Sequence, residues 1–242
     1  MKKCWVFDCG NTAVKWACFD GDQVLDSAAG EEGVAVGLAA AGSPDQVLVA
    51  ASGAIPDWLS SRFAGWDDVR VLRPGQATGV RTNYETPETL GLDRLANAAG
   101  AGRLVPTGAA VVVDLGTCVT VDVVENGTFL GGSIAPGYRM RLRAMADFTE
   151  ALPRLAMPEK SPAVGDLGQS TSSSMWVGAV AGLNAEVGAR IMEFDKVWPG
   201  LSVIVTGGDA SHLQLPEQYR IFADPLLTLK GFRAILQNIA DN

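Results

Sequence analysis

Two similar hairpin patterns constrain the fold of this chain more than any other feature of its sequence. The first runs from Cys4 to Phe19 and carries Asp8-Cys9-Gly10-Asn11-Thr12 between two apolar runs. The second runs from Val111 to Val124 and carries Asp114-Leu115-Gly116-Thr117 at the corresponding place. An apolar run, a small polar turn and an alternating run are typical of a strand, a tight turn and a returning strand.

Each hairpin is followed by a further turn and a further strand pattern. Asp20-Gly21-Asp22 precedes Val24-Leu25, and Glu125-Asn126-Gly127 precedes Phe129-Leu130. Asn-Gly is a strong signal for a two-residue hairpin turn. We therefore expect each half of the chain to open with a three-stranded meander. Two such units, about a hundred residues apart, indicate duplicated domains that face each other across a central cleft.

The segments between the meanders predict helices that pack on sheets, which makes the fold class α/β. The expected helices cover residues 33–41, a short turn from Pro56, 91–101, 139–151, 172–194 and 227–239. Further strands are expected at residues 45–52, 69–72 and 201–205. The polar segment from Pro74 to Glu88 is expected to be a long loop, and such loops are usually functional or mobile. We divide the chain into domains 1–104 and 105–242.

The first turn of each meander has the residues of a phosphate site. An acid and a hydroxyl lie beside a glycine, which lets a ligand approach the backbone closely. A phosphate group with its metal ion suits such a turn. A single turn of this kind is equally well an ordinary hairpin with a polar tip, because acidic hairpin tips are common.

The start of the third expected helix places Asp93 next to Arg94. An acid in the first turn of a helix favours the helix dipole, so Asp93 has a purely structural interpretation. An arginine at the same end is electrostatically less favourable, and Arg94 therefore suggests a ligand or a partner. An Asp–Arg pair also has the chemistry for a general base beside an anion-binding group.

Composition excludes several classes of protein. The net charge of −8 and the lack of a Lys/Arg cluster argue against a nucleic-acid surface. No apolar run reaches membrane-spanning length, and Met1-Lys2-Lys3 leads directly into a strand pattern, so we expect neither a membrane segment nor an export signal. The four cysteines, Cys4, Cys9, Cys18 and Cys118, are expected to be reduced, buried thiols in a cytoplasmic protein. The sole histidine, His212, lies in an expected loop with no Ser or Cys arranged for a triad.

Six motifs occur in a fixed order and give the chain a family resemblance. They are Asp8-x-Gly-Asn-Thr-x-x-Lys15, Gly91-x-Asp-Arg94, Asp114-x-Gly-Thr117, Gly131-Gly-x-Ile-x-Pro-Gly137, Thr171-x-x-Ser-Met175 with Gly178, and Thr206-Gly-Gly208. With these motifs the chain resembles the type III pantothenate kinases, also called the Bvg accessory factor-like family. The resemblance extends to the tail, Asp224-Pro-x-Leu-Thr-x-x-Gly231. It implies two ribonuclease-H-like domains of the kind found in actin, acetate kinase and sugar kinases.

The resemblance also implies an activity. Such an enzyme transfers a phosphoryl group from ATP to pantothenate and makes 4′-phosphopantothenate, the first step of coenzyme A synthesis. ATP with Mg²⁺ and a monovalent cation, K⁺ or NH₄⁺, are the implied cofactors. The implied partner is a second copy of the chain, with residues 142–155 and 175–183 as candidate interface segments and Tyr84 as a residue that completes the pocket across it.

The motifs imply a role for each matching residue. The ATP phosphates would lie against Asp8, Gly10, Asn11, Thr12 and Lys15, with Thr117 also touching ATP. Pantothenate would be held by Tyr84, Gly91, Leu92, Asp93, Arg94 and Thr171. Asp93 would be the general base. Asp8 would organise Mg²⁺ directly or through water, and Asp114 would bind the monovalent cation.

The residues support parts of this scheme by themselves. Arg94 has the planar fork for a bidentate pair with a carboxylate, which lysine lacks. Three carboxylates with few fixed cations would repel ATP unless bound cations intervene. Two departures from the family pattern, Ser170 and Trp176-Val177, are expected to alter packing near the substrate. Two alternatives stay open, a kinase of the same superfamily for another small substrate and a non-catalytic nucleotide-binding regulator.

Overall fold

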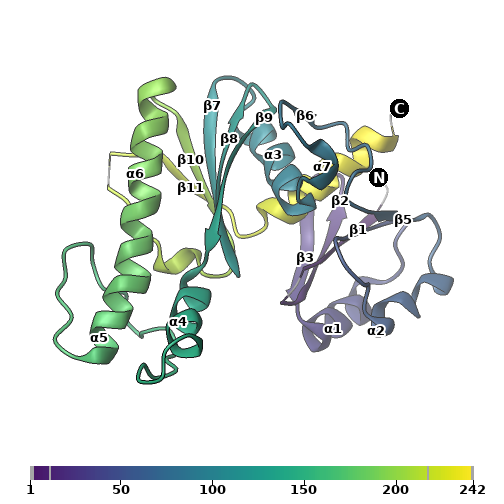
Figure 1. Cartoon of the computed structure of the whole chain (residues 1–242). Coiled ribbons are helices and arrows are strands. Elements are labelled where there is room, and N and C mark those ends of the chain that lie inside the picture. The colour runs from purple at the N-terminus through teal and green to yellow at the C-terminus, as the bar shows by residue number, and fades with distance from the viewer. Residues whose placement is uncertain (1–2, 11, 217, 241–242) are drawn as a thin grey trace. The chain divides into compact units, whose positions relative to one another are not determined.

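The computed structural model (Figure 1) describes residues 3–10, 12–216 and 218–240 of the chain. The chain forms two compact units. Unit 1 comprises the residues up to Pro106, the short segment Gly127–Phe129 and the chain from Leu226 onward. Unit 2 comprises Thr107–Asn126 and Leu130–Pro225. The chain therefore passes between the units at several points.

Unit 1 is built on a five-stranded sheet with the order β3-β2-β1-β4-β5. The strands are β1 (Lys3–Cys9), β2 (Val14–Asp20), β3 (Gln23–Ala29), β4 (Gln46–Ala51) and β5 (Val69–Leu72). β1, β2 and β3 form the antiparallel meander, and β4 and β5 continue the sheet in parallel from β1. Alternate residues of β1, β2 and β4 form an apolar core that contains Phe7, Trp16 and Val49.

The helices of unit 1 include two that pack closely against each other. The helical segments are α1 (Glu31–Ala41), α2 (Asp57–Ser60), η1 (Phe63–Gly65), η2 (Pro87–Thr89), α3 (Leu92–Leu104) and α7 (Leu227–Ala240). Glycines allow α3 and α7 to approach, because a Cβ at Gly231 would lie 1.7 Å from the carbonyl oxygen of Ala96. In the same contact the Thr228 hydroxyl donates to Asn97 Oδ1 at 2.8 Å.

Unit 2 repeats the strand order of unit 1. Its sheet has the order β11-β10-β7-β8-β9, and a short strand, β6 (Arg81–Thr82), is added beyond β9. The other strands are β7 (Ala109–Leu115), β8 (Cys118–Glu125), β9 (Thr128–Pro136), β10 (Ser202–Thr206) and β11 (Ile221–Ala223). β7 and β8 are antiparallel, whereas β10 is parallel to β7 and β11 is parallel to β10. β6 pairs with Thr128 and Phe129, which belong to unit 1.

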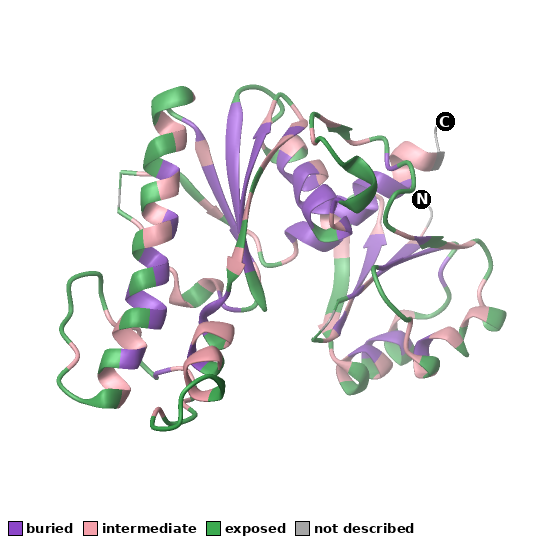
Figure 2. Cartoon of the chain, in the orientation of Figure 1, coloured by how far each residue is buried: buried purple, intermediate pink, exposed green. Residues whose placement is uncertain are grey.

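The core of unit 2 lies between its sheet and the long helix α6 (Gly182–Val197). Leu183, Val187 and Ile191 of α6 pack on Val111, Val113 and other alternate residues of the sheet. Figure 2 shows short buried stretches alternating with exposed ones along α6. The remaining helical segments are α4 (Tyr138–Asp147), α5 (Thr171–Trp176), a π-helical segment η3 (Val177–Ala181) and η4 (Ala210–His212).

The duplicated α/β fold expected from the sequence is confirmed. Both units contain an antiparallel meander whose first strand is extended by two parallel strands, which is the ribonuclease-H-like arrangement. The Asn126-Gly127 turn is also confirmed, because positive φ values of 48° and 72° are those of the expected two-residue hairpin turn. Within the described part of the chain, no helix has the length and apolar content needed to cross a bilayer.

Three features of the fold differ from the expectations. The segment from Pro74 to Glu88 contains β6 and the start of η2, so it is not wholly irregular. β11 was not predicted, because three residues are too few to show a pattern. The long helix expected from Ser172 to Phe194 is interrupted by the π-helical turn η3, where one extra residue is accommodated.

Candidate active site

The end of β1 carries the acid of the first hairpin. Phe7 and Cys9 point into the core of unit 1, so Asp8 lies on the opposite face of the sheet. Asp8 is paired with Lys15 across the antiparallel hairpin and with Ala50 on the parallel strand β4. Paired residues share a face, so a carboxylate and an ammonium group are neighbours here. Gly10 and Thr12 in the turn are exposed, and Asn11 lies outside the described residues.

The end of β7 carries the acid of the second hairpin in the same position. Asp114 is paired with Thr120 on β8 and with Thr206 on β10. Its neighbours Val113 and Leu115 belong to the core under α6, so the three polar side chains share the other face of the sheet. Thr120 is 8% exposed and Thr206 is 1% exposed. The hydroxyl oxygens of both threonines are buried without a hydrogen-bond partner among the described residues.

The turn after Asp114 is enclosed by glycines from two other segments. A Cβ at Gly137 would lie 2.3 Å from the carbonyl oxygen of Gly116, and Gly137 N–H donates to the Thr117 carbonyl at 3.1 Å. Gly207 has a φ of 96°, and a Cβ there would lie 2.4 Å from the Leu115 carbonyl oxygen. The close approach at Gly137 and Gly207 is therefore an approach to the protein's own backbone. These contacts fix the shape of the turn that contains Thr117.

A charged pair lies beside this turn. The Arg139 guanidinium donates to Asp209 Oδ1 from two nitrogens, at 3.2 and 3.1 Å, and Asp209 N–H donates to the Leu115 carbonyl at 2.9 Å. The adjacent Tyr138 is fully buried, and its hydroxyl donates to Asn184 Oδ1 at 2.6 Å. Burial, with the Asp209 carboxylate nearby, raises the pKa of the Tyr138 phenol above its ordinary value. Tyr138 is consequently a neutral structural group at physiological pH.

The first turn of α3 holds Asp93 by a local hydrogen bond. Asp93 Oδ1 accepts from the backbone N–H of Arg94 at 2.9 Å. Gly91 is the N-cap, and a Cβ at that position would lie 2.5 Å from Asp93 Oδ1. The glycine therefore makes room for the carboxylate, which remains exposed to solvent. Leu92, the other residue of this motif, is buried and anchors the start of the helix.

Arg94 is buried, with an exposed fraction of 4%. Its guanidinium carbon lies 5.5 Å from the ring centre of Tyr84 and 5.2 Å from the ring centre of Phe129. The two rings are 5.8 Å apart and meet at 61°. The structure thus brings together two residues that the sequence proposes for pantothenate, Tyr84 and Arg94, and adds Phe129, which the sequence analysis missed.

Thr171 lies at the first turn of α5, where Ser170 is the N-cap. Ser170 and Ser173 form a reciprocal capping box, with Ser173 N–H donating to Ser170 Oγ at 3.2 Å. The departure from the family pattern at Ser170 is thereby explained as a helix cap. Thr171 itself is exposed.

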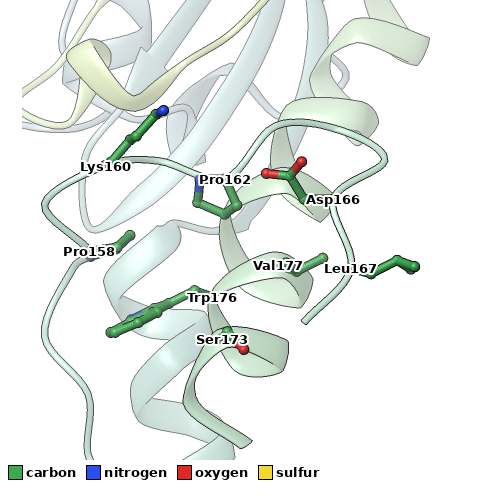
Figure 3. A pocket seen from close by; sticks show the side chains of 8 residues that line it. All are labelled: Pro158, Lys160, Pro162, Asp166, Leu167, Ser173, Trp176 and Val177. Atoms are coloured by element: carbon green, nitrogen blue, oxygen red, sulfur yellow. The ribbon is translucent and has the colours of Figure 1, made fainter. Parts of the chain in front are cut away.

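An open pocket of about 220 Å³ lies beside α5 (Figure 3). It is lined by Pro158, Lys160, Pro162, Asp166, Leu167, Ser173, Trp176 and Val177. The second family departure, Trp176-Val177, forms part of this lining. Trp176 also donates from Nε1 to the Ala156 carbonyl at 3.0 Å and so fastens the loop before α5. None of the residues that the sequence proposes for catalysis or binding lines this pocket.

One expectation about the side chains, the burial of Cys118, is wrong. His212 has a serine partner that the sequence analysis did not foresee, because Ser161 Oγ lies 2.8 Å from His212 Nδ1. Fifty-one positions separate these residues in the chain, so no local motif could reveal the pair. Cys118 is exposed, whereas Cys4, Cys9 and Cys18 are buried as expected.

The proposed site residues form separate groups within the two units. Unit 1 contains Asp8, Gly10, Thr12 and Lys15 at the first hairpin, and Tyr84 with Gly91–Arg94 at the start of α3. Unit 2 contains Asp114, Thr117 and Thr171. In the part of the chain that the structure describes, no three His, Cys, Asp or Glu residues cluster as a metal site. A metal ion at Asp8 or Asp114 would therefore be completed by further ligands, such as phosphate oxygens or water.

Comparisons with known proteins agree on one family. The family model described as type III pantothenate kinase matches residues 4–193 of the chain. A type III pantothenate kinase of Phocaeicola vulgatus is 40% identical over 158 residues, which are 65% of this chain and 64% of that protein. The alignment thus spans slightly less than two thirds of that relative.

A second relative is aligned over nearly its whole length. The type III pantothenate kinase of Flavobacterium johnsoniae is 31% identical over 97% of this chain and 98% of its own. The crystal structure of a Baf family protein from Campylobacter jejuni superposes with a TM-score of 0.57 at 20% identity, covering 98% of this chain and 100% of that one. The structural likeness supports the fold, and the family model and the sequence matches establish that this chain belongs to the type III pantothenate kinase family.

Proposed function

We propose that this protein transfers the γ-phosphoryl group of ATP to pantothenate and so makes 4′-phosphopantothenate, the first step of coenzyme A synthesis. The observation that carries the proposal is the arrangement at the start of α3 in a chain of this family. There an exposed carboxylate, Asp93, is adjacent to an arginine held against Tyr84. A base beside an anion-binding group is what a hydroxyl acceptor with a carboxylate requires.

The acceptor is proposed to bind unit 1 through its own functional groups. Asp93 takes the proton of the attacking hydroxyl, for which its exposed carboxylate is accessible. Arg94 pairs with the pantothenate carboxylate, and Tyr84 covers the guanidinium. Gly91 and Leu92 hold this turn in place, and Thr171 supplies a further hydroxyl to the acceptor.

The nucleotide is proposed to bind through both hairpin turns. The ATP phosphates lie against Asp8, Gly10, Thr12 and Lys15, and Thr117 contacts the nucleotide from the second turn. Mg²⁺ fits at Asp8, because this ion is commonly held by one or two carboxylates together with phosphate oxygens and water. Bound Mg²⁺ would neutralise phosphate charge, while Lys15, paired with Asp8, supplies a fixed positive charge.

A monovalent cation, K⁺ or NH₄⁺, is proposed at Asp114. The donor set fits such an ion, because Asp114 lies between two threonines whose buried hydroxyl oxygens have no partner in the described chain. A buried hydroxyl without a partner costs about 1–3 kcal/mol, so two of them beside one carboxylate suggest an absent ligand. Asp114, Thr120 and Thr206 offer oxygen atoms, which suit these ions.

Further proposals concern the state of the protein. We expect a homodimer, although most apolar residues of the proposed interface segments pack within unit 2, where Leu142, Met175 and Ala179 form a small core. Phe148, which is 88% exposed, remains as a candidate contact. Light scattering at micromolar concentration should give twice the chain mass of 25.3 kDa. We also expect the protein to act in the cytoplasm, where its free thiols would remain reduced.

One assay tests the proposed activity. Purified protein is incubated with Mg·ATP, KCl and either pantothenate or a panel of sugars and small carboxylic acids, and the phosphorylated product is identified by mass spectrometry. We expect 4′-phosphopantothenate and no product from the panel. Transfer to a panel member in place of pantothenate would assign another kinase activity. Nucleotide binding without any transfer would indicate a regulator.

A further inference from the structure

Phe129 is a buried aromatic residue that no sequence motif assigns to the site. It lies near the start of β9 and has an exposed fraction of 0%. Together with Gly127 and Thr128 it belongs to unit 1, although the rest of β9 belongs to unit 2. The second hairpin of this meander, β8–β9, thus contributes the segment Gly127–Phe129 to the unit that contains Arg94.

The ring of Phe129 is one of two that contact the Arg94 guanidinium. The 5.2 Å separation from the ring centre is within the range of a cation–π interaction, and the Tyr84 ring is at 5.5 Å. A buried guanidinium needs compensation for the hydration that it loses, and two aromatic faces supply part of it. The hydrogen-bond donors of a guanidinium lie in its plane, so contacts with ring faces are compatible with a carboxylate at its edge.

The backbone of Phe129 holds the second aromatic residue as well. Its carbonyl accepts from the N–H of Asn83 at 3.0 Å, and Thr82 is its partner in the β6–β9 pairing. Thr82 Oγ1 in turn accepts from the N–H of Tyr84 at 3.0 Å. Phe129 therefore contacts Arg94 directly through its ring and fixes the segment that carries Tyr84 through its main chain.

We infer that Phe129 is a positioning residue for the acceptor site, which holds the Arg94 guanidinium in the orientation that binds a substrate carboxylate. This inference rests on the proposed function. Phe129 acts on acceptor binding and not on the phosphoryl transfer itself, because its ring contacts the guanidinium of the anion-binding residue. Weakening the cation–π contact between its ring and Arg94 should therefore raise the KM for pantothenate and leave kcat and the KM for ATP nearly unchanged.

Site-specific fluorination tests the inference with little change of shape. Phe129 is replaced by 4-fluoro-, 3,5-difluoro- and 3,4,5-trifluorophenylalanine, which progressively withdraw charge from the ring face. We expect the KM for pantothenate to rise stepwise, to about tenfold for the trifluoro residue, as expected for a cation–π contact. The same series at Phe232, a fully buried residue of α7, is the matched control and should leave every constant within about twofold of wild type.

A second variant checks the interpretation of the fluorination experiment. Phe129→Leu keeps an apolar side chain and the main-chain carbonyl, so it should give the KM effect of the trifluoro residue with kcat retained. If the enzyme phosphorylates pantothenate but its KM for pantothenate stays constant across the fluorinated residues at position 129, the inference is overturned and the proposed function stays intact. Equal losses of kcat and of affinity for both substrates would also overturn it, since they would mark a core residue. A wild-type protein inactive on pantothenate would overturn both.

Discussion

The two units have the same strand order but surround their equivalent carboxylates differently. In unit 1, Asp8 at the end of β1 is flanked by Lys15 and Ala50 on the neighbouring strands. In unit 2, Asp114 at the end of β7 is flanked by Thr120 and Thr206. Both carboxylates lie one position before the last pair of their hairpin, so the side chains at the neighbouring strand positions can be compared directly.

The difference suggests how each carboxylate is compensated near a polyphosphate. Asp8 has a fixed positive charge at the adjacent position, and Asp114 has only hydroxyl groups at both adjacent positions. A unit charge at 4 Å contributes about 4 kcal/mol at an intermediate dielectric, so the exchange of lysine for threonine at this strand position is a large difference. The comparison therefore predicts that a cation from solution contributes more at Asp114 than at Asp8, in agreement with the proposed monovalent cation.

The largest effect is expected at Asp93, which lies outside the two hairpins that the comparison concerns. If Asp8 and Asp114 both bind cations, neither is the general base, and Asp93 is the remaining candidate. Asp93→Asn should lower kcat by roughly 10²–10⁴-fold, because the proton acceptor is lost while the shape is kept. ATP affinity, measured by calorimetry, should stay within about twofold of wild type. Near-normal kcat would mean that Asp93 is not the general base and that its carboxylate serves only to accept the hydrogen bond from the Arg94 N–H.

Removing the charge of Asp114 should abolish the response to K⁺. Asp114→Asn should lower turnover roughly a hundredfold at saturating K⁺, because the cation is no longer held beside the phosphates. The measurement is turnover at saturating Mg·ATP with K⁺, NH₄⁺ or Na⁺ at matched ionic strength. Lys15→Ala is the matched comparison from unit 1, where turnover should fall but the ratio of activities with and without K⁺ should persist. Unchanged K⁺ activation in Asp114→Asn would contradict the proposed difference between the carboxylates of the two units.

Two buried threonines test whether the hydroxyls beside Asp114 are reserved for a ligand. Thr228 in unit 1 donates to Asn97 at 2.8 Å, whereas Thr206 in unit 2 has no hydrogen-bond partner among the described residues. Thr228→Val should lower the free energy of unfolding by about 1–3 kcal/mol, since it removes a buried hydrogen bond to Asn97 Oδ1. Thr206→Val should be neutral or stabilising without K⁺.

The melting temperatures of Thr228→Val and Thr206→Val in the presence of K⁺ provide a second measurement. In the presence of Mg·ADP, KCl should raise the melting temperature of wild type and Thr228→Val more than NaCl does at matched ionic strength. Thr206→Val should lose most of that difference. An equal loss of stability in both variants without K⁺ would mean that Thr206 is hydrogen-bonded, through water for example, and serves no cation.

The smallest effect distinguishes the cysteines of the two units. Burial raises the pKa of Cys4 and of Cys9 in unit 1 from 9.0 to about 11, whereas Cys118 in unit 2 is exposed. A thiol whose folded pKa is raised contributes its stability below pH 9 and loses it as the pH rises toward 11, because only the unfolded chain ionises. The free energy of unfolding should fall by roughly 1 kcal/mol per thiol between pH 8 and 9.5. Urea titrations of wild type and of Cys4→Ala with Cys9→Ala measure this term, and an identical slope in both proteins would exclude it.

Local patterns were sufficient to predict the duplicated meanders and most helices. The alternation in residues 111–124 and the Asn126-Gly127 turn depend on interactions within a few residues, so they are visible in the sequence. The same holds for the glycine at position 91, which adjoins the acid that it accommodates. These features place Asp8, Asp93 and Asp114 at element ends without any knowledge of the tertiary structure.

Features that depend on distant residues were not predictable in this way. The contact of Phe129 with Arg94 joins positions that are far apart in the chain, and Phe129 looks like any buried strand residue. β6 and β11 have two and three residues, too few for a periodic signal. The periodicity of α7 predicts a helix but does not say which sheet it covers. The position of Thr120 and Thr206 beside Asp114 could be known only from the register of three strands.

The π-helical turn at Val177–Ala181 sets the angular phase of Thr171 about the long helix. Met175 and Val180 are both buried although five positions separate them, and the later buried residues Leu183, Val187 and Ile191 return to steps of three and four. Each residue of an α-helix advances the azimuth by about 100°. A π turn uses about one residue more than an α turn for the same rotation, so a regular α-helix of the same length would present Thr171 about 100° away from its present direction. Deleting one residue between Val177 and Ala181 would convert the segment to a regular α-helix and keep both Thr171 and the core contacts of α6 in place. The direction in which this end of unit 2 presents its hydroxyl therefore depends on the π turn, in a stretch of small apolar residues with no chemistry of its own.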